Sequence, residues 1–300
     1  MKENIFKFFE NVILSDSLNE KTSNTYTIIK SLDKLIELLN SEYSEALQQF
    51  KNGKFIYRGA KNYLNSNDLA VIVTPGIRVS KDNVPNIYTI LTSELFYSWK
   101  KFPRRNRSHI CSLNLDTTKE YSDISYYVFP KNDTNIGVCP DSDIWYSFRT
   151  KYNRSADTLS HMLFFIFTMI LDYDIDEIKA SFNTASNTFK LFTEFDKKLD
   201  SFTDSKKKEC IEVFNENYDN NRLFSDFIKF VEKNNKSDFL QFIEKNIFSS
   251  KDFKVVNISN LSTIVSNYKE VWFEGPAIYI PTHYKYFKTN IFKTIKKDNL

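Results

Sequence analysis

Residues 269–281 read KEVWFEGPAIYIP, and this segment decides what kind of fold the chain forms. Two runs within it, 270–273 and 277–280, consist mostly of β-branched and aromatic residues, and a Gly-Pro pair lies between them. Short runs of this kind, bounded by glycine and proline, are typical of β-strands. We therefore expect two strands here, and with them a fold that contains a β-sheet.

The other turn-forming residues indicate more strands earlier in the chain. All five glycines and all seven prolines lie within 53–140 or 275–281. Short apolar runs within the first of these ranges, and one run after residue 250, predict further strands at 54–58, 69–73, 108–114, 125–129 and 254–258. A helix is expected at 86–99, where apolar residues precede Pro103.

The first 52 residues and the long stretch after Pro140 lack glycine and proline, so helices can continue there unbroken. Apolar residues recur three or four positions apart from Ile28 to Leu39, which predicts a helix that starts near Ser23. From about residue 155 to 250 a similar amphipathic pattern predicts a series of helices.

Together these patterns predict an α+β fold with a split β-rich core. The core consists of residues 53–150 and 251–300. An N-terminal helical segment, residues 1–52, precedes it, and a large helical insertion, residues 151–250, separates its two halves. A length of 300 residues fits such a division, because compact domains usually contain ~100–200 residues.

Composition excludes several classes of protein. The net charge of +3, from 41 Lys and Arg against 38 Asp and Glu, is too small for a strongly basic nucleic-acid coat or an acidic tail. Three scattered Cys and three His, without ligand-pair spacing, predict neither a disulfide framework nor a metal site. The most apolar stretch, 162–171, is about half of the ~20 residues that a membrane span needs. With no signal-peptide pattern, we expect a soluble cytoplasmic protein.

Three polar residues on expected strands are the candidates for chemistry. Arg58 ends a strand just before Gly59, where a guanidinium can hold a pyrophosphate through two parallel hydrogen bonds. The alternative is an edge-strand Arg paired with a carboxylate. Ser112 lies in the strand HICSLN, and its alternative role is structural. Glu270 alternates with Val271, so it is not simply a core residue, and its alternative is a solvent-facing carboxylate.

The YRG sequence at 57–59, Ser112 on a middle strand and Glu270 at the head of a late strand together resemble the Arg–Ser–Glu class of ADP-ribosyltransferases, the toxin and ectoenzyme type. The resemblance implies an ADP-ribosyltransferase-like core that splits NAD, releases nicotinamide and transfers ADP-ribose to an acceptor. It covers short segments within 54–115 and 265–281. The segments FPRRNRSHICSLN, VFPKNDTNIGVCP and KEVWFEGP also resemble parts of a group of phage-encoded proteins, which would act in a host cytoplasm.

The resemblance implies roles for individual residues, with NAD as the substrate and no metal. Glu270 is the expected catalytic residue, whose carboxylate stabilises the ribose as nicotinamide leaves. Glu274, two positions along the same strand face, is the other carboxylate that the pattern allows. Residues expected to bind NAD are Arg58, Ser112, Tyr57, Gly59 and Trp272. Position 268 is Tyr, whereas arginine-modifying members carry Gln or Glu there.

Other functions stay open at the level of sequence. The implied acceptor is an unknown macromolecule, a protein in preference to a nucleic acid. A chain that kept this scaffold without turnover would instead be a non-enzymatic protein that binds another protein or a nucleic acid. Basic residues cluster at 104–107, and they alternate with aromatic residues at 284–297. Such segments can bind single-stranded nucleic acid through phosphate contacts and stacking, and the alternative is a solvated charged face, which is the commoner role of such residues.

Overall fold

A computed structural model of the chain describes residues 21–22, 24–79, 83–144, 146–148, 156–217, 222–233, 238–266 and 269–284. The chain divides into two compact units, which we call the sheet unit and the helical unit. The sheet unit comprises Thr22–Arg78, Lys101–Ile144 and Asp252–Leu300, and the helical unit includes Val79–Lys100 and Trp145–Lys251. Each unit is therefore assembled from stretches that are distant in the sequence.

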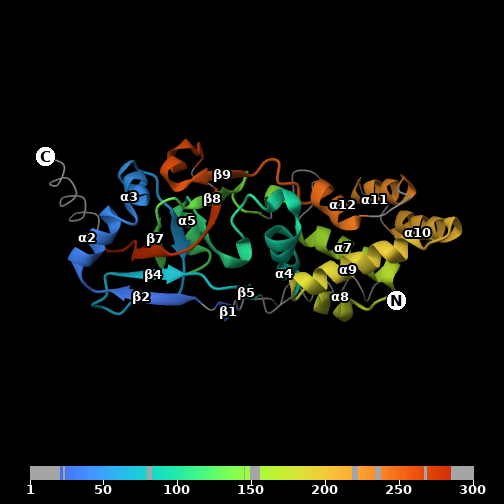
Figure 1. Cartoon of the computed structure of the whole chain (residues 1–300), viewed down its shortest axis with the longest axis horizontal. Coiled ribbons are helices and arrows are strands. Elements are labelled where there is room, and N and C mark those ends of the chain that lie inside the picture. The colour runs from blue at the N-terminus through green and yellow to red at the C-terminus, as the bar shows by residue number, and fades with distance from the viewer. Residues whose placement is uncertain are drawn as a thin grey trace. The chain divides into compact units, whose positions relative to one another are not determined.

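Strands of the sheet unit form one antiparallel sheet of nine strands in the part of the chain that the structure describes (Figure 1). In chain order these strands are β2 (Thr25–Ile29), β3 (Tyr57–Gly59), β4 (Ala70–Thr74), β6 (Ser108–Ser112), β7 (Ser125–Pro130), β8 (Asn135–Val138), β9 (Lys254–Asn257), β10 (Glu270–Glu274) and β11 (Ala277–Pro281). Their order across the sheet is β2-β4-β11-β7-β3-β6-β10-β8-β9. Two short strands, β1 (Lys21–Thr22) and β5 (Arg78–Val79), pair separately.

The two strands of the 269–281 segment do not form a hairpin. β10 pairs with β6 and β8, whereas β11 pairs with β4 and β7. The link between them contains Gly275, whose φ of 93° favours glycine over other residues. This single short segment thus supplies one strand to each half of the sheet, and β3 lies between the two halves.

The single helix expected between Ser23 and Leu39 is wrong, because a strand occupies the first part of this range. β2 pairs with β4 along its whole length. The helix α2 (Leu32–Asn40) begins only after Ser31, whose hydroxyl caps it by accepting a hydrogen bond from the Lys34 amide. Four of the five residues of β2 are β-branched, and such residues favour an extended chain where a partner strand is available.

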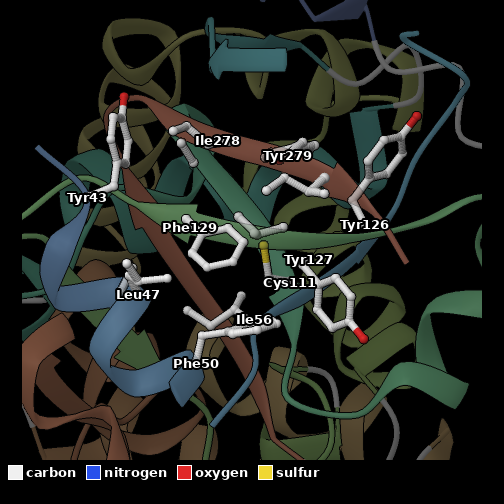
Figure 2. Packing of buried hydrophobic residues seen from close by; sticks show 14 of the residues in the cluster. Tyr43, Leu47, Phe50, Ile56, Cys111, Tyr126, Tyr127, Phe129, Ile278 and Tyr279 are labelled. Carbon is white, nitrogen blue, oxygen red and sulfur yellow. The ribbon is translucent and has the colours of Figure 1, made fainter. Parts of the chain in front are cut away.

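Helix α2 and the following helix, α3 (Ser44–Lys51), contribute apolar side chains to the core of the sheet unit. The Phe50 ring packs nearly perpendicular to the Tyr127 ring, with centroids 5.1 Å apart, and lies 5.2 Å from the Phe129 ring. Figure 2 shows these rings together with Ile56 and Cys111 in the same cluster. The abundant aromatic residues of the chain thus supply much of the buried apolar surface that stabilises the unit.

Shorter helices complete the described part of the sheet unit: η3 (Arg105–Arg107), α5 (Leu115–Lys119) and η4 (Ile258–Thr263). The helical unit contains α4 (Asn83–Ile90), η1 (Leu91–Leu95), η2 (Tyr97–Trp99), α7 (Ala156–Leu171), α8 (Ile175–Ser181), α9 (Ala185–Asp200), α10 (Asp204–Asn217), α11 (Arg222–Lys233) and α12 (Phe239–Asn246). Helices α7 to α12 confirm the helices predicted between residues 155 and 250 (Figure 1).

Phenylalanine rings form the core of the helical unit. Phe239 on α12 stacks on Phe195 of α9, with centroids 4.2 Å apart, and it also contacts Phe167 of α7 and Phe227 of α11. Residues 79–100 belong to this unit rather than to the sheet, since the indole Nε1 of Trp99 donates to the carbonyl oxygen of Phe248 at 2.7 Å.

Helices and one antiparallel sheet together confirm the predicted α+β class. The boundaries of the two units differ from the domain boundaries expected from the sequence. Described residues of the expected N-terminal helical segment, from 24 to 52, belong to the sheet unit. The expected insertion, 151–250, belongs to the helical unit, which takes residues 79–100 from the expected core as well.

A glycine on β8 leaves room for a large side chain of the neighbouring strand, β10. Gly137 and Trp272 are register partners, and a Cβ on Gly137 would lie 2.3 Å from the indole ring. Trp272 is fully buried, and its Nε1 donates to the carbonyl oxygen of Pro103 at 2.8 Å. The absence of a side chain at Gly137 therefore fixes where the indole lies.

We expect Gly137→Ala to lower the free energy of unfolding by ~1–3 kcal/mol, the usual cost of overpacking a core, because the added methyl group displaces Trp272. Guanidinium denaturation measures this loss, and the near-ultraviolet circular dichroism of the indole should change with it. Gly53→Ala is the control: a Cβ there meets no atom within 4 Å, so only its positive φ of 76° is strained and the indole signal stays. Wild-type stability with an unchanged indole signal in Gly137→Ala would contradict this account.

Candidate functional site

Three adjacent strands, β3, β6 and β10, carry the candidate residues at the middle of the sheet. Ser112 on β6 pairs with Tyr57 on β3 and with Glu270 on β10, so these three residues form one row across the sheet. Side chains in such a row leave the sheet on the same face. Arg58 follows Tyr57 and is directed to the opposite face, the face of Cys111. The structure thus brings Tyr57, Ser112 and Glu270 together and directs the side chain of Arg58 away from them.

The two oxygens of the Glu270 carboxylate lie in different surroundings. Oε1 accepts a hydrogen bond from Nη1 of Arg105 at 2.5 Å, and the Cys139 thiol donates to the same oxygen at 3.6 Å. Among the described residues, no donor forms a hydrogen bond to Oε2. The side chain is 12% exposed. Glu270 is therefore a nearly buried carboxylate with one fixed oxygen and one oxygen left for a further donor.

Arg105 is itself held by Trp272. The carbon of its guanidinium lies 5.2 Å from the centroid of the Trp272 ring, a cation–π contact. Phe102 stacks on the same indole, with centroids 6.0 Å apart. Because Trp272 is fully buried among these groups, the structure leaves it no open face for the contact with NAD that the resemblance implies. Its observed role is to support the cation beside Glu270.

Glu274, the other carboxylate on this face of β10, has both oxygens occupied. The backbone amide of Arg104 donates to Oε1 at 2.7 Å, and Nη2 of the same residue donates to Oε2 at 2.9 Å. Glu274 is also more exposed than Glu270, at 32% against 12%. An open oxygen beside Ser112 distinguishes Glu270 from Glu274.

The Arg58 guanidinium has a carbonyl group as its partner rather than a carboxylate. Its Nη1 donates to the carbonyl oxygen of Ile110 at 3.1 Å, and no carboxylate of the described residues forms an ion pair with it. Burial opposes its charge, but the nearby Tyr279 hydroxyl, with Cys111 and Tyr63, raises the pKa of Arg58. Since β3 is an interior strand, the alternative of an edge-strand ion pair does not apply. Within the described residues, the cation therefore has the Ile110 carbonyl and the Cys111 thiol beside it but no carboxylate.

Cys111 connects the two charged candidates. Burial, the main cause, raises the pKa of its thiol to about 12, while Arg58 lowers this pKa and Glu270 raises it. Both charges thus act on one side chain of the middle strand, although they leave the sheet on opposite faces. At neutral pH Cys111 is a protonated thiol, so it is not a nucleophile.

The remaining predicted residues have structural contacts of their own. The Ser112 hydroxyl accepts a hydrogen bond from the Asn114 amide at 3.0 Å, which stabilises the turn after β6. The Tyr57 ring packs against Tyr127, 5.4 Å away, and burial raises the pKa of Tyr57 to about 12. A Cβ on Gly59 would lie 2.3 Å from the carbonyl oxygen of Thr118, so Gly59 permits the close approach of α5.

Sequence reasoning missed three residues near this site: Arg105, Cys139 and His109. Arg105 was included in a basic cluster that suggested nucleic-acid binding, yet it and Arg104 form ion pairs with glutamates of β10. The basic residues at 285–297 and Tyr268 lie outside the described residues. The only sequence signal for Arg105 was its charge, because its partner is 165 positions away.

His109 forms a buried polar pair on the face of Arg58. Its Nδ1 lies 2.6 Å from the Tyr279 hydroxyl, and its Nε2 lies 2.9 Å from the carbonyl oxygen of Gly275. A carbonyl only accepts, so Nε2 carries the proton and Nδ1 accepts from Tyr279. Burial, followed by the charge of Arg58, lowers the pKa of His109 to about 3. His109 is therefore neutral in the folded protein at physiological pH.

Among the described residues, no three His, Cys, Asp or Glu side chains lie together in a way that would hold a metal ion. The described helices include none with the length and apolar character required to cross a membrane. Comparisons with protein-family models, with curated proteins and with solved structures find no match to the chain. The resemblance to ADP-ribosyltransferases thus depends on the short motifs around Arg58, Ser112 and Glu270.

We expect acid to destabilise the sheet unit through His109. Its pKa falls from an ordinary 6.5 to about 3 on folding, so its contribution to stability is complete above pH 6.5 and declines as the pH falls toward 3. At pH 5 the loss is ~2 kcal/mol. Guanidinium denaturation at several pH values should show that His109→Gln flattens this dependence, whereas replacement of the exposed His283 by Gln does not. If the free energy of unfolding depends on pH equally in wild type and His109→Gln, His109 is not the cause of the acid sensitivity.

Proposed function

We propose that the chain is an NAD-dependent mono-ADP-ribosyltransferase whose catalytic carboxylate is Glu270. The observation that carries the proposal is the row of Ser112 and Glu270 on adjacent strands, with Oε2 of the carboxylate open. The row supports the proposal because it joins two of the three motifs that resemble the enzyme class, although 158 positions separate these residues. Arg58, the residue of the third motif, does not share this face, because its side chain leaves the sheet on the side of Cys111.

In the proposed reaction, the bond between the ribose C1′ and the nicotinamide nitrogen breaks, and its electron pair leaves with nicotinamide. Positive charge then develops on C1′ and on the ring oxygen of the ribose. Oε2 of Glu270 accepts a hydrogen bond from the ribose 2′-hydroxyl and stabilises this charge. A nucleophile of the acceptor, a protein or a nucleic acid, forms the new bond to C1′ and loses its proton.

The roles of Ser112 and Arg58 in this proposal differ, because the two side chains leave the sheet on opposite faces. An NAD molecule bound at Glu270 lies on the face of Ser112, so a contact between its phosphates and the Arg58 guanidinium does not follow from this geometry. The Ser112 hydroxyl uses its oxygen to accept from Asn114, and its own proton remains for a ribose oxygen or for Glu270. In this proposal NAD is the substrate and no metal takes part.

We expect Glu270→Gln to lower kcat for nicotinamide release by ~10²–10³-fold, because a neutral amide does not stabilise the developing charge. The substitution keeps the size of the side chain but leaves the nearly buried Arg105 without its negative partner, so the melting temperature should fall. The kcat values are therefore compared at a temperature where the variant is folded. Nicotinamide release from labelled NAD measures the effect. Glu274→Gln is the matched control on the same strand face, and it should keep wild-type kcat. Full activity in Glu270→Gln would remove this residue from the catalytic role.

A second candidate function is a non-enzymatic binding protein on the same scaffold. One observation favours it: Glu270 already has a charged partner in Arg105, so the carboxylate is compensated without any ligand. The cluster at 104–107 then favours a protein over a nucleic acid as the partner, because two of its three arginines are engaged by glutamates.

Equilibrium dialysis with labelled NAD separates the two candidates. The enzyme should bind NAD and release nicotinamide. Arg58→Gln should keep a KM for NAD within ~3-fold of wild type, because Arg58 lies on the face of the sheet opposite Glu270. Binding without turnover, or no binding, would favour the non-enzymatic function. A KM for NAD that rises ~10-fold or more in folded Arg58→Gln would show that Arg58 does contact NAD and would contradict this placement.

A further inference from the structure

The Arg-Arg pair at 104–105 has no part in the function proposed so far, although Arg105 contacts the proposed catalytic carboxylate directly. We infer that Arg105 is a positioning residue, which holds Oε1 of Glu270 so that Oε2 alone is presented to the ribose. The inference rests on the proposed function, since it states what orients the carboxylate of that reaction.

The contact is nearly closed to solvent. The side chains of Arg105 and Glu270 are 11% and 12% exposed, and their closest atoms are 2.5 Å apart. Burying a carboxylate without a partner is costly, and pairing with a hydrogen-bonded cation offsets that cost. The ion pair is therefore what allows a charged Glu270 at this depth in the sheet.

The guanidinium is fixed by its other contacts as well. Trp272 lies beneath it at 5.2 Å, and Trp272 is in turn held by the Pro103 carbonyl and by the space that Gly137 leaves. Pro103 lies two residues before Arg105, and Trp272 lies two residues after Glu270. The hydrogen bond between Pro103 and Trp272 therefore joins the two segments that carry the ion pair. A rigid support of this kind is what a preorganised site requires.

The neighbouring ion pair shows that an arginine beside a glutamate does not by itself give this arrangement. Arg104 donates to both oxygens of Glu274, and the two side chains are 42% and 32% exposed. At Glu270 the Cys139 thiol adds to the contact on Oε1, so both donors act on one oxygen. The open Oε2 is thus a specific feature of the Arg105 contact.

The test compares Arg105→Met, which keeps the packing on Trp272 but removes the charge, with Arg105→Lys, which keeps the charge. We expect kcat for nicotinamide release to fall ~10²-fold in Arg105→Met, with a KM for NAD within ~3-fold of wild type. Arg105→Lys should recover most of the lost kcat. Arg104→Met removes the neighbouring cation and should keep wild-type kcat. Melting temperatures show which variants are folded.

Several outcomes overturn the inference. Unchanged kcat in folded Arg105→Met would mean that the contact is structural. If kcat stays at the wild-type value and a higher KM for NAD accounts for the whole fall in kcat/KM, Arg105 binds NAD itself. If Arg105→Met does not fold, the kcat of Arg105→Lys tests the inference instead. A kcat of Arg105→Lys as low as that of Glu270→Gln overturns the inference. A wild-type chain that releases no nicotinamide would instead overturn the proposed function, and the inference with it.

Discussion

The arrangement at the middle of the sheet depends on one ion pair, that between Arg105 and Glu270. A nearly buried carboxylate needs a compensating charge, and within the described part of the chain Arg105, in the segment before β6, supplies it. This requirement determines much of what surrounds the site. Trp272 supports the guanidinium, and Gly137 leaves space for the indole. The missing side chain of Gly137 on β8 thus leaves room for the Trp272 ring. That ring supports the guanidinium that pairs with the Glu270 carboxylate on β10.

Much of the fold could be predicted from the sequence because local signals were strong. The strands β10 and β11 were recognised from short apolar runs on either side of Gly275 and Pro276, and the helices after residue 155 from their amphipathic period. β2 was missed because its isoleucines also match a helical period, and only pairing with β4 settles their conformation. β8 was missed because its residues, NIGV, form a run too short to stand out.

The candidate site could be predicted only in part. Motifs placed Arg58, Ser112 and Glu270 on strands, and their strands are indeed adjacent. Which face each side chain takes depends on register, and register depends on pairing between strands far apart in the chain. The partner of Glu270 could not be inferred at all, since no local pattern relates Arg105 to a residue 165 positions later. Short apolar runs therefore located the strands, whereas the electrostatics of the site depend on tertiary contacts.

The composition of the helical unit also has a consequence for how this protein can be divided. Its described helices come from two separate stretches, Val79–Lys100 and Trp145–Lys251, and the indole of Trp99 in the first donates a hydrogen bond to the backbone carbonyl of Phe248 in the second. Removal of the longer stretch alone would strip Ile87, Leu91 and Trp99 of their apolar surroundings. The helical unit is therefore not encoded by one continuous stretch of sequence. Recombination that transferred its helices to another protein would have to move both stretches together.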